Sequence, residues 1–176
     1  IFLCYTLEVT SNIYICGQIC TMKNEGESMF VIGVGASAGG LEALSVFLSR
    51  FPGKSGDFAI IIAQHLSPKY KSMLVELLAR QSALEVVEAL NGARIEQGKV
   101  YVAPPDCDIT VKDGSIRLDK PTLQAGPKPC IDLLLKSLAE EFRNHAIGVI
   151  LSGTGSDGAN GICTVKEQGG YSELLQ

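Results

Sequence analysis

Tryptophan is absent from this chain, histidine occurs only twice, and lysine and arginine do not cluster anywhere. The net charge over the 176 residues is -4, so neither sign of charge dominates. Because nucleic-acid binding needs concentrated positive charge to neutralise phosphates, the sequence predicts no nucleic-acid partner. The length is about that of one domain, which is enough to bury a hydrophobic core.

Paired cysteine motifs are also missing. The six cysteines are scattered along the chain, and Cys16 and Cys20 have no second pair or neighbouring histidine to complete a tetrahedral zinc site. We interpret the cysteines as reduced thiols of a cytoplasmic protein, and we predict neither a metal site nor a cofactor.

The first 29 residues lack a long hydrophobic run. Their longest uncharged stretch, Val9–Met22, is interrupted by polar residues and is too short to span a bilayer, and no basic start of a secretory signal precedes it. Patterned sequence begins at Met29. We therefore treat residues 1–29 as an unassigned extension outside the domain that residues 30–176 form, and we predict no insertion into a membrane.

Apolar runs alternate with amphipathic segments in the rest of the chain. The runs predict strands at 30–35, 58–63, 84–87, 100–103 and 146–151, and the helical spacing of apolar residues predicts helices at 41–51, 73–80, 131–142 and 159–168. Asp113-Gly114 predicts a hairpin between 109–112 and 115–118. The alternation implies a three-layer, doubly wound α/β fold, with a mostly parallel sheet, helices on both faces and a small β-hairpin.

Three polar loops follow directly on predicted strands, and they carry Ser37, His65 and Asp157. In such sheets, ligands bind outside the carboxyl ends of the strands. Ser37 stands in a Gly-x-Ser-x-Gly turn, a motif that lifts a serine hydroxyl clear of its own backbone. A serine nucleophile needs an imidazole base, and the base needs a carboxylate to orient it. We therefore predict that these residues act as nucleophile, base and orienting acid.

Each of the three residues also has a purely structural interpretation. Ser37 fits a turn residue as well as a nucleophile, His65 could be an ordinary loop histidine, and Asp157 is well placed to cap the last helix. Asp106, after another strand, is the second candidate acid. His145 precedes its strand and so belongs to the opposite edge of the sheet, which excludes it as the base. The hypothesis of a triad depends on the shared edge.

Two phosphate-binding interpretations compete with the hydrolase. Gly33–Ala38 fits a relaxed dinucleotide fingerprint, but Gln64 and His65 stand where that motif needs an acidic residue to bind ribose. Gly53-Lys54-Ser55 is only half of a P-loop, and it follows a helix instead of a strand. We reject the P-loop and keep a nucleotide-binding domain as a third hypothesis.

Four blocks of the sequence together resemble the catalytic domain of the chemotaxis protein-glutamate methylesterase family. They are Ile32–Gly40, Ala63–His65, Val102–Asp106 and Gly148–Gly158. Their order and context match, and the resemblance extends from Phe30 to Gly170. The blocks are most similar to the versions found in hybrid methylesterase/methyltransferase signalling proteins.

The resemblance implies a cytoplasmic serine hydrolase that needs no cofactor. Its substrates would be glutamate γ-methyl esters on the cytoplasmic helices of methyl-accepting chemoreceptors, with deamidation of certain glutamines as a second activity. Ser37, His65 and Asp157 would be nucleophile, base and acid. The backbone N–H of Ala38 and the Thr154 segment would stabilise the oxyanion. A fused or separate regulatory or methyltransferase domain is an expected partner.

The sequence departs from the family in two places. We expect no receiver domain before Met29, and the family continues past Gly169-Gly170 with a further strand and helix. Because the sequence ends at Gln176, we expect these last two elements to be missing and residues 30–176 to form a truncated catalytic domain. A catalytically disabled receptor-docking module is therefore the alternative function.

Overall fold

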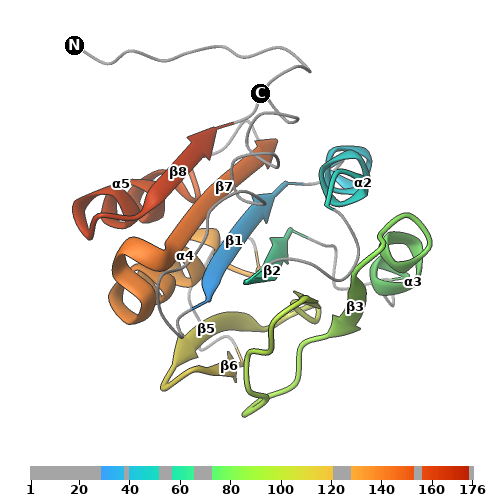
Figure 1. Cartoon of the computed structure of the whole chain (residues 1–176), viewed down its shortest axis with the longest axis horizontal. Helices are drawn as coiled ribbons and strands as arrows, with labels where there is room; N and C mark the ends of the chain where they lie inside the picture. The colour runs from blue at the N-terminus through green and yellow to red at the C-terminus, as the bar shows by residue number, and fades with distance from the viewer. Residues whose placement is uncertain are drawn as a thin grey trace.

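A six-stranded parallel sheet forms the centre of the molecule. The computed structural model describes residues 29–37, 40–51, 57–65, 73–120, 128–152 and 156–174. In spatial order the strands of the sheet are β3 (Glu85–Glu88), β4 (Lys99–Val102), β2 (Phe58–Gln64), β1 (Phe30–Ala36), β7 (Ala146–Ser152) and β8 (Tyr171–Leu174). The arrows of β1, β7 and β8 in Figure 1 point the same way, so their carboxyl ends share one edge.

The two strands at the centre, β1 and β2, are buried along their whole length. Both are continuous apolar runs rich in β-branched residues, a composition typical of strands that are covered on both faces. They pair in parallel from Phe30 beside Phe58 to Ala36 beside Gln64. This register brings the residues that follow the two strands next to each other.

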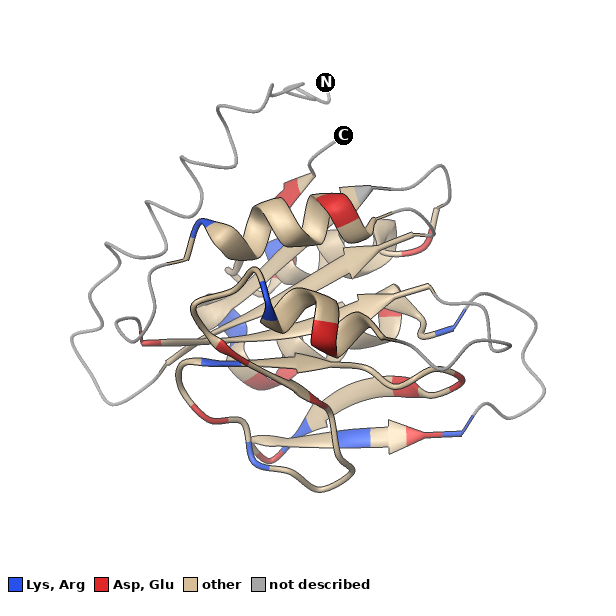
Figure 2. Cartoon of the chain, turned by 90° about the vertical axis from the view of Figure 1, so that its right-hand side faces the viewer, with Lys and Arg blue, Asp and Glu red and all other residues tan. Residues whose placement is uncertain are grey.

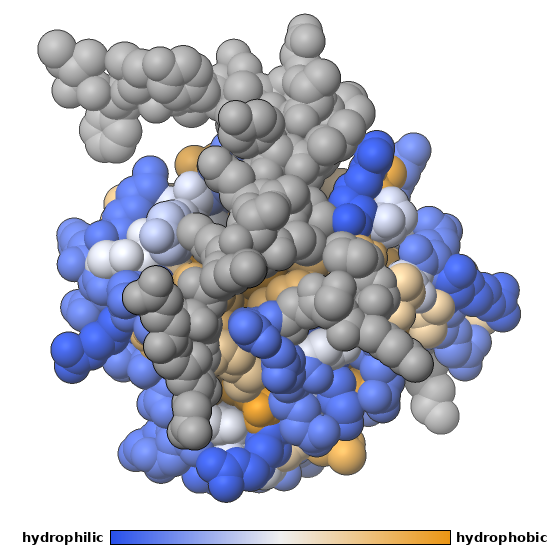
Figure 3. Space-filling model, viewed as in Figure 1, coloured by the Kyte–Doolittle hydropathy of each residue, from blue (hydrophilic) through white to orange (hydrophobic). Residues whose placement is uncertain are grey.

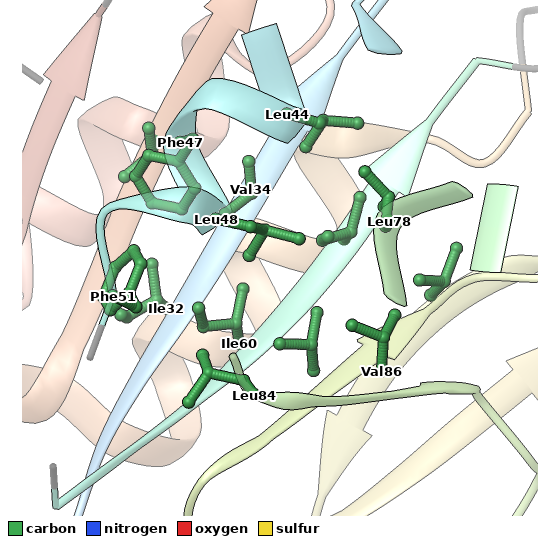
Figure 4. Packing of buried hydrophobic residues seen from close by; sticks show 14 of the residues in the cluster. Ile32, Val34, Leu44, Phe47, Leu48, Phe51, Ile60, Leu78, Leu84 and Val86 are labelled. Atoms are coloured by element: carbon green, nitrogen blue, oxygen red, sulfur yellow. The ribbon is translucent and has the colours of Figure 1, made fainter. Parts of the chain in front are cut away.

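Helices cover both faces of the sheet. On one face lie α2 (Leu41–Ser49) and α3 (Leu74–Ala79), and on the other lie α4 (Ile131–Phe142) and α5 (Ala159–Glu167). Alternate residues of the strands point to opposite faces, so the core has two halves. Figure 4 shows the half covered by α2, where Val34 lies between Leu44 and Leu48 in the view.

Two glycines of β1 let α4 pack directly on the sheet. A Cβ atom at Gly33 would lie 2.5 Å from Leu138 Cδ1, and one at Gly35 would lie 2.5 Å from Ile131 Cγ2. The Gly-x-Ser-x-Gly motif predicts a turn around Ser37. Gly35, its first glycine, instead belongs to β1, and its missing side chain leaves room for a helix.

The predicted hairpin is confirmed as β5 (Asp108–Lys112) and β6 (Ser115–Asp119), a separate antiparallel pair. Asp113 and Gly114 between them both have positive φ, as the tight turn requires. The hairpin is attached to α4, since the Val111 N–H donates to Ser137 Oγ at 3.0 Å. A short 3-10 turn, η1 (Arg143–His145), links α4 to β7.

The predicted α/β class and its order of elements are confirmed, with one correction. We expected the family's strand after Gly169-Gly170 to be missing, yet β8 is present and pairs in parallel with β7. Its residues gave no signal because this edge strand has no apolar run, and Tyr171 and Leu174 are about half exposed. Backbone hydrogen bonding to β7 forms the strand, and a pattern of side chains does not reveal such pairing.

The surface carries mixed charge. On the side shown in Figure 2, acidic and basic residues are interspersed instead of gathering by sign. On the face shown in Figure 3, apolar residues are visible near the centre and hydrophilic residues surround them. Within the described stretches, no helix has the length and apolar character needed to cross a membrane.

Candidate active site

Ser37 and His65 occupy equivalent positions at the carboxyl edge of the sheet. Ser37 directly follows β1 and His65 directly follows β2, the neighbouring strand. The parallel ladder continues one step past the strands, because the His65 backbone N–H donates to Ala36 O at 2.9 Å. The backbones of the predicted nucleophile and the predicted base therefore run side by side, and both side chains are partly buried.

Asp157 comes to His65 from a third loop. His65 Nε2 lies 2.9 Å from Asp157 Oδ2, and the two side chains are 17% and 18% exposed. They are 92 positions apart in the sequence, so only the fold brings them together. When the proton on Nε2 is donated to the carboxylate, Nδ1 keeps a lone pair that can accept a proton. This is the arrangement that a general base needs.

The same carboxylate also binds the amino-terminal end of α4. Asp157 Oδ2 accepts the Ile131 N–H at 2.9 Å, Oδ1 accepts the Asp132 N–H at 3.0 Å, and the Cys130 thiol lies 3.5 Å from Oδ1. Burial by itself would raise the pKa of Asp157, but the two backbone N–H groups, His65 and Cys130 outweigh it and lower the pKa below its ordinary value of 3.8. The carboxylate is thus ionised at neutral pH.

The interpretation of Asp157 as the cap of the last helix is wrong, because the helix that it caps is α4 and not α5. The N-cap residue of α5 is Gly158, with φ 99° and no side-chain cap. Asp157 instead places its carboxylate on a different helix, α4, where the helix dipole favours negative charge. One side chain therefore both caps α4 and orients His65.

The two other candidates are not part of this cluster. Asp106 is exposed in the turn between β4 and β5, and the carboxylate that His65 contacts is that of Asp157. His145 lies in η1 before β7, where its ring centroid is 5.1 Å from that of Phe30. Phe30 begins β1 and Ser37 follows its end, so His145 is about 20 Å from the site at ~3.3 Å per residue.

Comparisons with known proteins identify the family of the chain. The family described as CheB methylesterase matches residues 32–174. The chain belongs to the CheB methylesterase family. The catalytic domain of CheB methylesterase from Thermotoga maritima is a structural match, with a TM-score of 0.73 and 31% identity over 82% of this chain and 78% of that one.

Two curated relatives are both named protein-glutamate methylesterase/protein-glutamine glutaminase. The one from Rhizobium etli is 38% identical over 143 residues, which are 79% of this chain and 41% of the relative. The one from Clostridium acetobutylicum is 33% identical over 153 residues, or 86% of this chain and 44% of the relative. The chain thus spans less than half the length of these CheB relatives.

Part of the predicted site lies outside the described residues. Both proposed oxyanion segments, Ala38 and Thr154, fall there. On the described side of the serine loop, the Gly40 N–H donates to Ser37 O at 2.9 Å and Gly40 is the N-cap of α2. Among the described residues, no group of three or more His, Cys, Asp or Glu side chains could hold a metal ion.

A second group of residues, which the sequence did not point to, anchors the starts of α4 and α5 next to Asp157. Asp108 pairs with Lys128 at 2.6 Å and accepts the Cys130 N–H at 2.8 Å, which anchors the start of α4. Asp132 accepts hydrogen bonds from the start of α5. Asp132 could have been noticed as an acidic residue in the first turn of a predicted helix. The spacing of Asp108 and Lys128 in the sequence gave no indication of their contact.

Gln64, the last residue of β2, has no role in the hydrolase that the sequence predicts. Its side chain is 5% exposed, and its Oε1 atom has no hydrogen-bond partner among the described residues. Since Gln64 and His65 stand where a dinucleotide site needs an acid, and the relatives are methylesterases, the nucleotide-binding hypothesis has no support in the site.

Proposed function

We propose that this chain is the catalytic unit of a cytoplasmic protein-glutamate methylesterase that uses Ser37 as nucleophile, His65 as base and Asp157 as orienting acid. The observation that carries the proposal is the 2.9 Å contact between His65 and Asp157 beside the Ser37 turn. The ionised carboxylate holds the ring and stabilises the imidazolium that forms when the base accepts a proton.

The reaction has two steps. Ser37 Oγ attacks the carbonyl carbon of a glutamate γ-methyl ester while its proton passes to His65 Nδ1, and the imidazolium then returns that proton to the departing methoxide, which leaves as methanol. Water attacks the acyl-enzyme, again giving a proton to His65. The acyl–oxygen bond breaks, Ser37 is reprotonated, and a free glutamate is released.

The oxyanion that forms in each step needs hydrogen-bond donors. The backbone N–H of Ala38 and the Thr154 segment are the donors we propose, because Ala38 directly follows Ser37 and Thr154 follows β7 in the sequence. A donor of this kind acts on charge that exists only in the transition state and contributes roughly 3 kcal/mol. Glutamine deamidation would use the same steps, with ammonia as the leaving group.

The expected substrates are methylated glutamates on the cytoplasmic helices of methyl-accepting chemoreceptors. The names of the relatives support this class of substrate, since they include both a methylesterase and a glutaminase activity. A regulatory or methyltransferase domain, fused or separate, is the partner we propose for control of the activity. Methylated receptor fragments are therefore the substrate for the test.

The test is methanol release from a methylated receptor fragment by the full chain. Ser37→Ala should lower the rate about 10⁴-fold or more, and adding His65→Ala should cost little further because the two residues act as a unit. Ser49→Ala, at an exposed serine of α2, is the matched control and should keep the wild-type rate. Receptor binding with no methanol release by the wild-type chain would instead establish the disabled docking module.

A further inference from the structure

The helices α4 and α5 cap each other with exchanged carboxylates. Asp157, just before α5, accepts the N–H groups of Ile131 and Asp132 at the start of α4. Asp132, in the first turn of α4, accepts the N–H groups of Gly158 and Gly161 at the start of α5, at 3.1 and 2.7 Å. The N-cap residues of the two helices, Cys130 and Gly158, provide no side-chain cap of their own.

This exchange closes a loop of hydrogen bonds around the proposed acid. The side chain of Asp157 is bound by the backbone of Asp132, and the backbone that follows Asp157 is bound by the side chain of Asp132. Asp132 Oδ2 additionally accepts from Asn160 Nδ2 at 3.2 Å. Hydrogen bonds therefore hold both the carboxylate oxygen atoms of Asp157 and the backbone next to this residue. Asp132 takes part in both sets of bonds.

We propose that Asp132 is a positioning residue for the His65–Asp157 pair, an inference that rests on the proposed function. Without its carboxylate, the first N–H groups of α5 lose their acceptor and the Gly158 turn loses its anchor. Asp157 would then keep its bonds to α4 while its backbone moves, so the contact with His65 Nε2 would loosen. A small displacement of a group that takes part in the reaction slows the chemical step more than it weakens substrate binding.

The first experiment compares methanol release by Asp132→Ala, Asp132→Asn and Ser137→Ala in the full chain. Asp132→Ala should lower kcat about 10- to 100-fold and change KM less than about threefold. Asp132→Asn keeps Oδ1 as the acceptor for Gly158 and Gly161, so it should stay within about fivefold of wild type. Ser137→Ala removes a different anchor of α4, the acceptor for the Val111 N–H, and should keep kcat.

The second readout is the NMR signal of the proton on His65 Nε2, which the hydrogen bond to Asp157 shifts downfield. The chain has only two histidines, so the signal can be assigned by its loss in His65→Gln. It should weaken or vanish in Asp132→Ala and persist in Ser137→Ala. A merely structural role of Asp132 would leave this signal intact in the folded variant.

A folded Asp132→Ala with wild-type kcat and an unchanged signal would overturn the proposal. If that variant does not fold, Asp132→Gln takes its place: its longer side chain moves the acceptor away from the N–H groups of Gly158 and Gly161, so a weakened signal supports the proposal and an unchanged signal overturns it. If wild-type protein releases no methanol, the proposed function fails by itself. The signal in the two Asp132 variants then remains the test of positioning.

Discussion

At the scale of single residues, Asp157 both caps α4 and contacts His65, the residue that we propose as the base. Its two oxygen atoms serve His65, the Ile131 N–H and the Asp132 N–H, all within 3.0 Å. The helix end keeps the carboxylate ionised, and an ionised carboxylate is what an imidazole base requires. Capping and orientation are therefore coupled, and a substitution here should affect both stability and activity.

Asp157→Asn should destabilise the fold by about 1–2 kcal/mol at pH 7, because an amide NH₂ would face the N–H donors of His65 and Ile131. The pKa of Asp157 is lower in the folded chain than 3.8, so its ionisation stabilises the fold above that pH. This stabilisation is lost as pH falls below 3.8 and through the folded pKa. The deficit of Asp157→Asn relative to wild type in urea unfolding should thus shrink below pH 4.

Asp113→Asn is the control for this measurement. Asp113 is exposed in the hairpin turn with φ 54°, a conformation that asparagine tolerates. Its free energy of unfolding should follow the wild type at every pH. A pH-independent deficit in Asp157→Asn would contradict the role assigned to the ionised carboxylate.

At the scale of elements, the contact between α4 and α5 determines where Asp157 stands. The two helices lie side by side over one face of the sheet. A Cβ atom at Gly161 would lie 2.6 Å from Leu135 Cβ and 3.3 Å from Asp132 Cα. Neither atom is the end of a flexible side chain, so the helices would have to separate to admit it.

Gly161→Ala should therefore destabilise the chain by about 1–3 kcal/mol, although alanine is the better helix former by ~1 kcal/mol. The measurement is the shift of the urea midpoint. Cys163→Ala, at an exposed position of the same helix, is the control and should change stability by less than about 0.5 kcal/mol. A Gly161→Ala variant as stable as this control would show that the helices can separate at no cost.

At the scale of the whole molecule, the sheet is buried at its centre and more exposed at its edge. β1 is hydrogen-bonded to strands on both sides and is fully buried, whereas among the described residues β8 pairs only with β7, and Tyr171 is 52% exposed. A strand with few buried contacts and one hydrogen-bonded side opens locally at a low free-energy cost. Ser37 and His65 follow the central strands, so the proposed site is attached to the best-buried part of the sheet.

Amide hydrogen exchange should reveal this gradient. The amides of β8 should exchange about 100-fold faster than those of β1, because the edge strand can open without global unfolding. Amides of β2, the other strand beside β1, are the internal comparison and should exchange as slowly as those of β1. Equal protection of β8 and β1 would mean that the edge unfolds only with the whole domain.

The order of elements was predictable from local patterns. Continuous apolar runs marked β1, β2 and β7, and Asp113-Gly114 marked the hairpin, because burial on both faces and a tight turn each demand particular residues at adjacent positions. The edge strand β8 was not predicted, because a strand with half-exposed side chains does not require a run of apolar residues. The family was recognisable from four blocks of sequence, and the prediction of Ser37, His65 and Asp157 as site residues rests on the loops that follow three predicted strands.

The sequence by itself determined that these three residues belong to one edge of a parallel sheet, because strand direction follows from the alternation of strands and helices. Only the tertiary structure decided what Asp157 does there. An aspartate before a helix is expected to cap that helix, and here it caps α4 while Asp132 caps α5 in return. Such an exchange depends on the distance between two helices. The glycine and the side chains packed between them set this distance, and no pattern of neighbouring residues in the sequence reveals it.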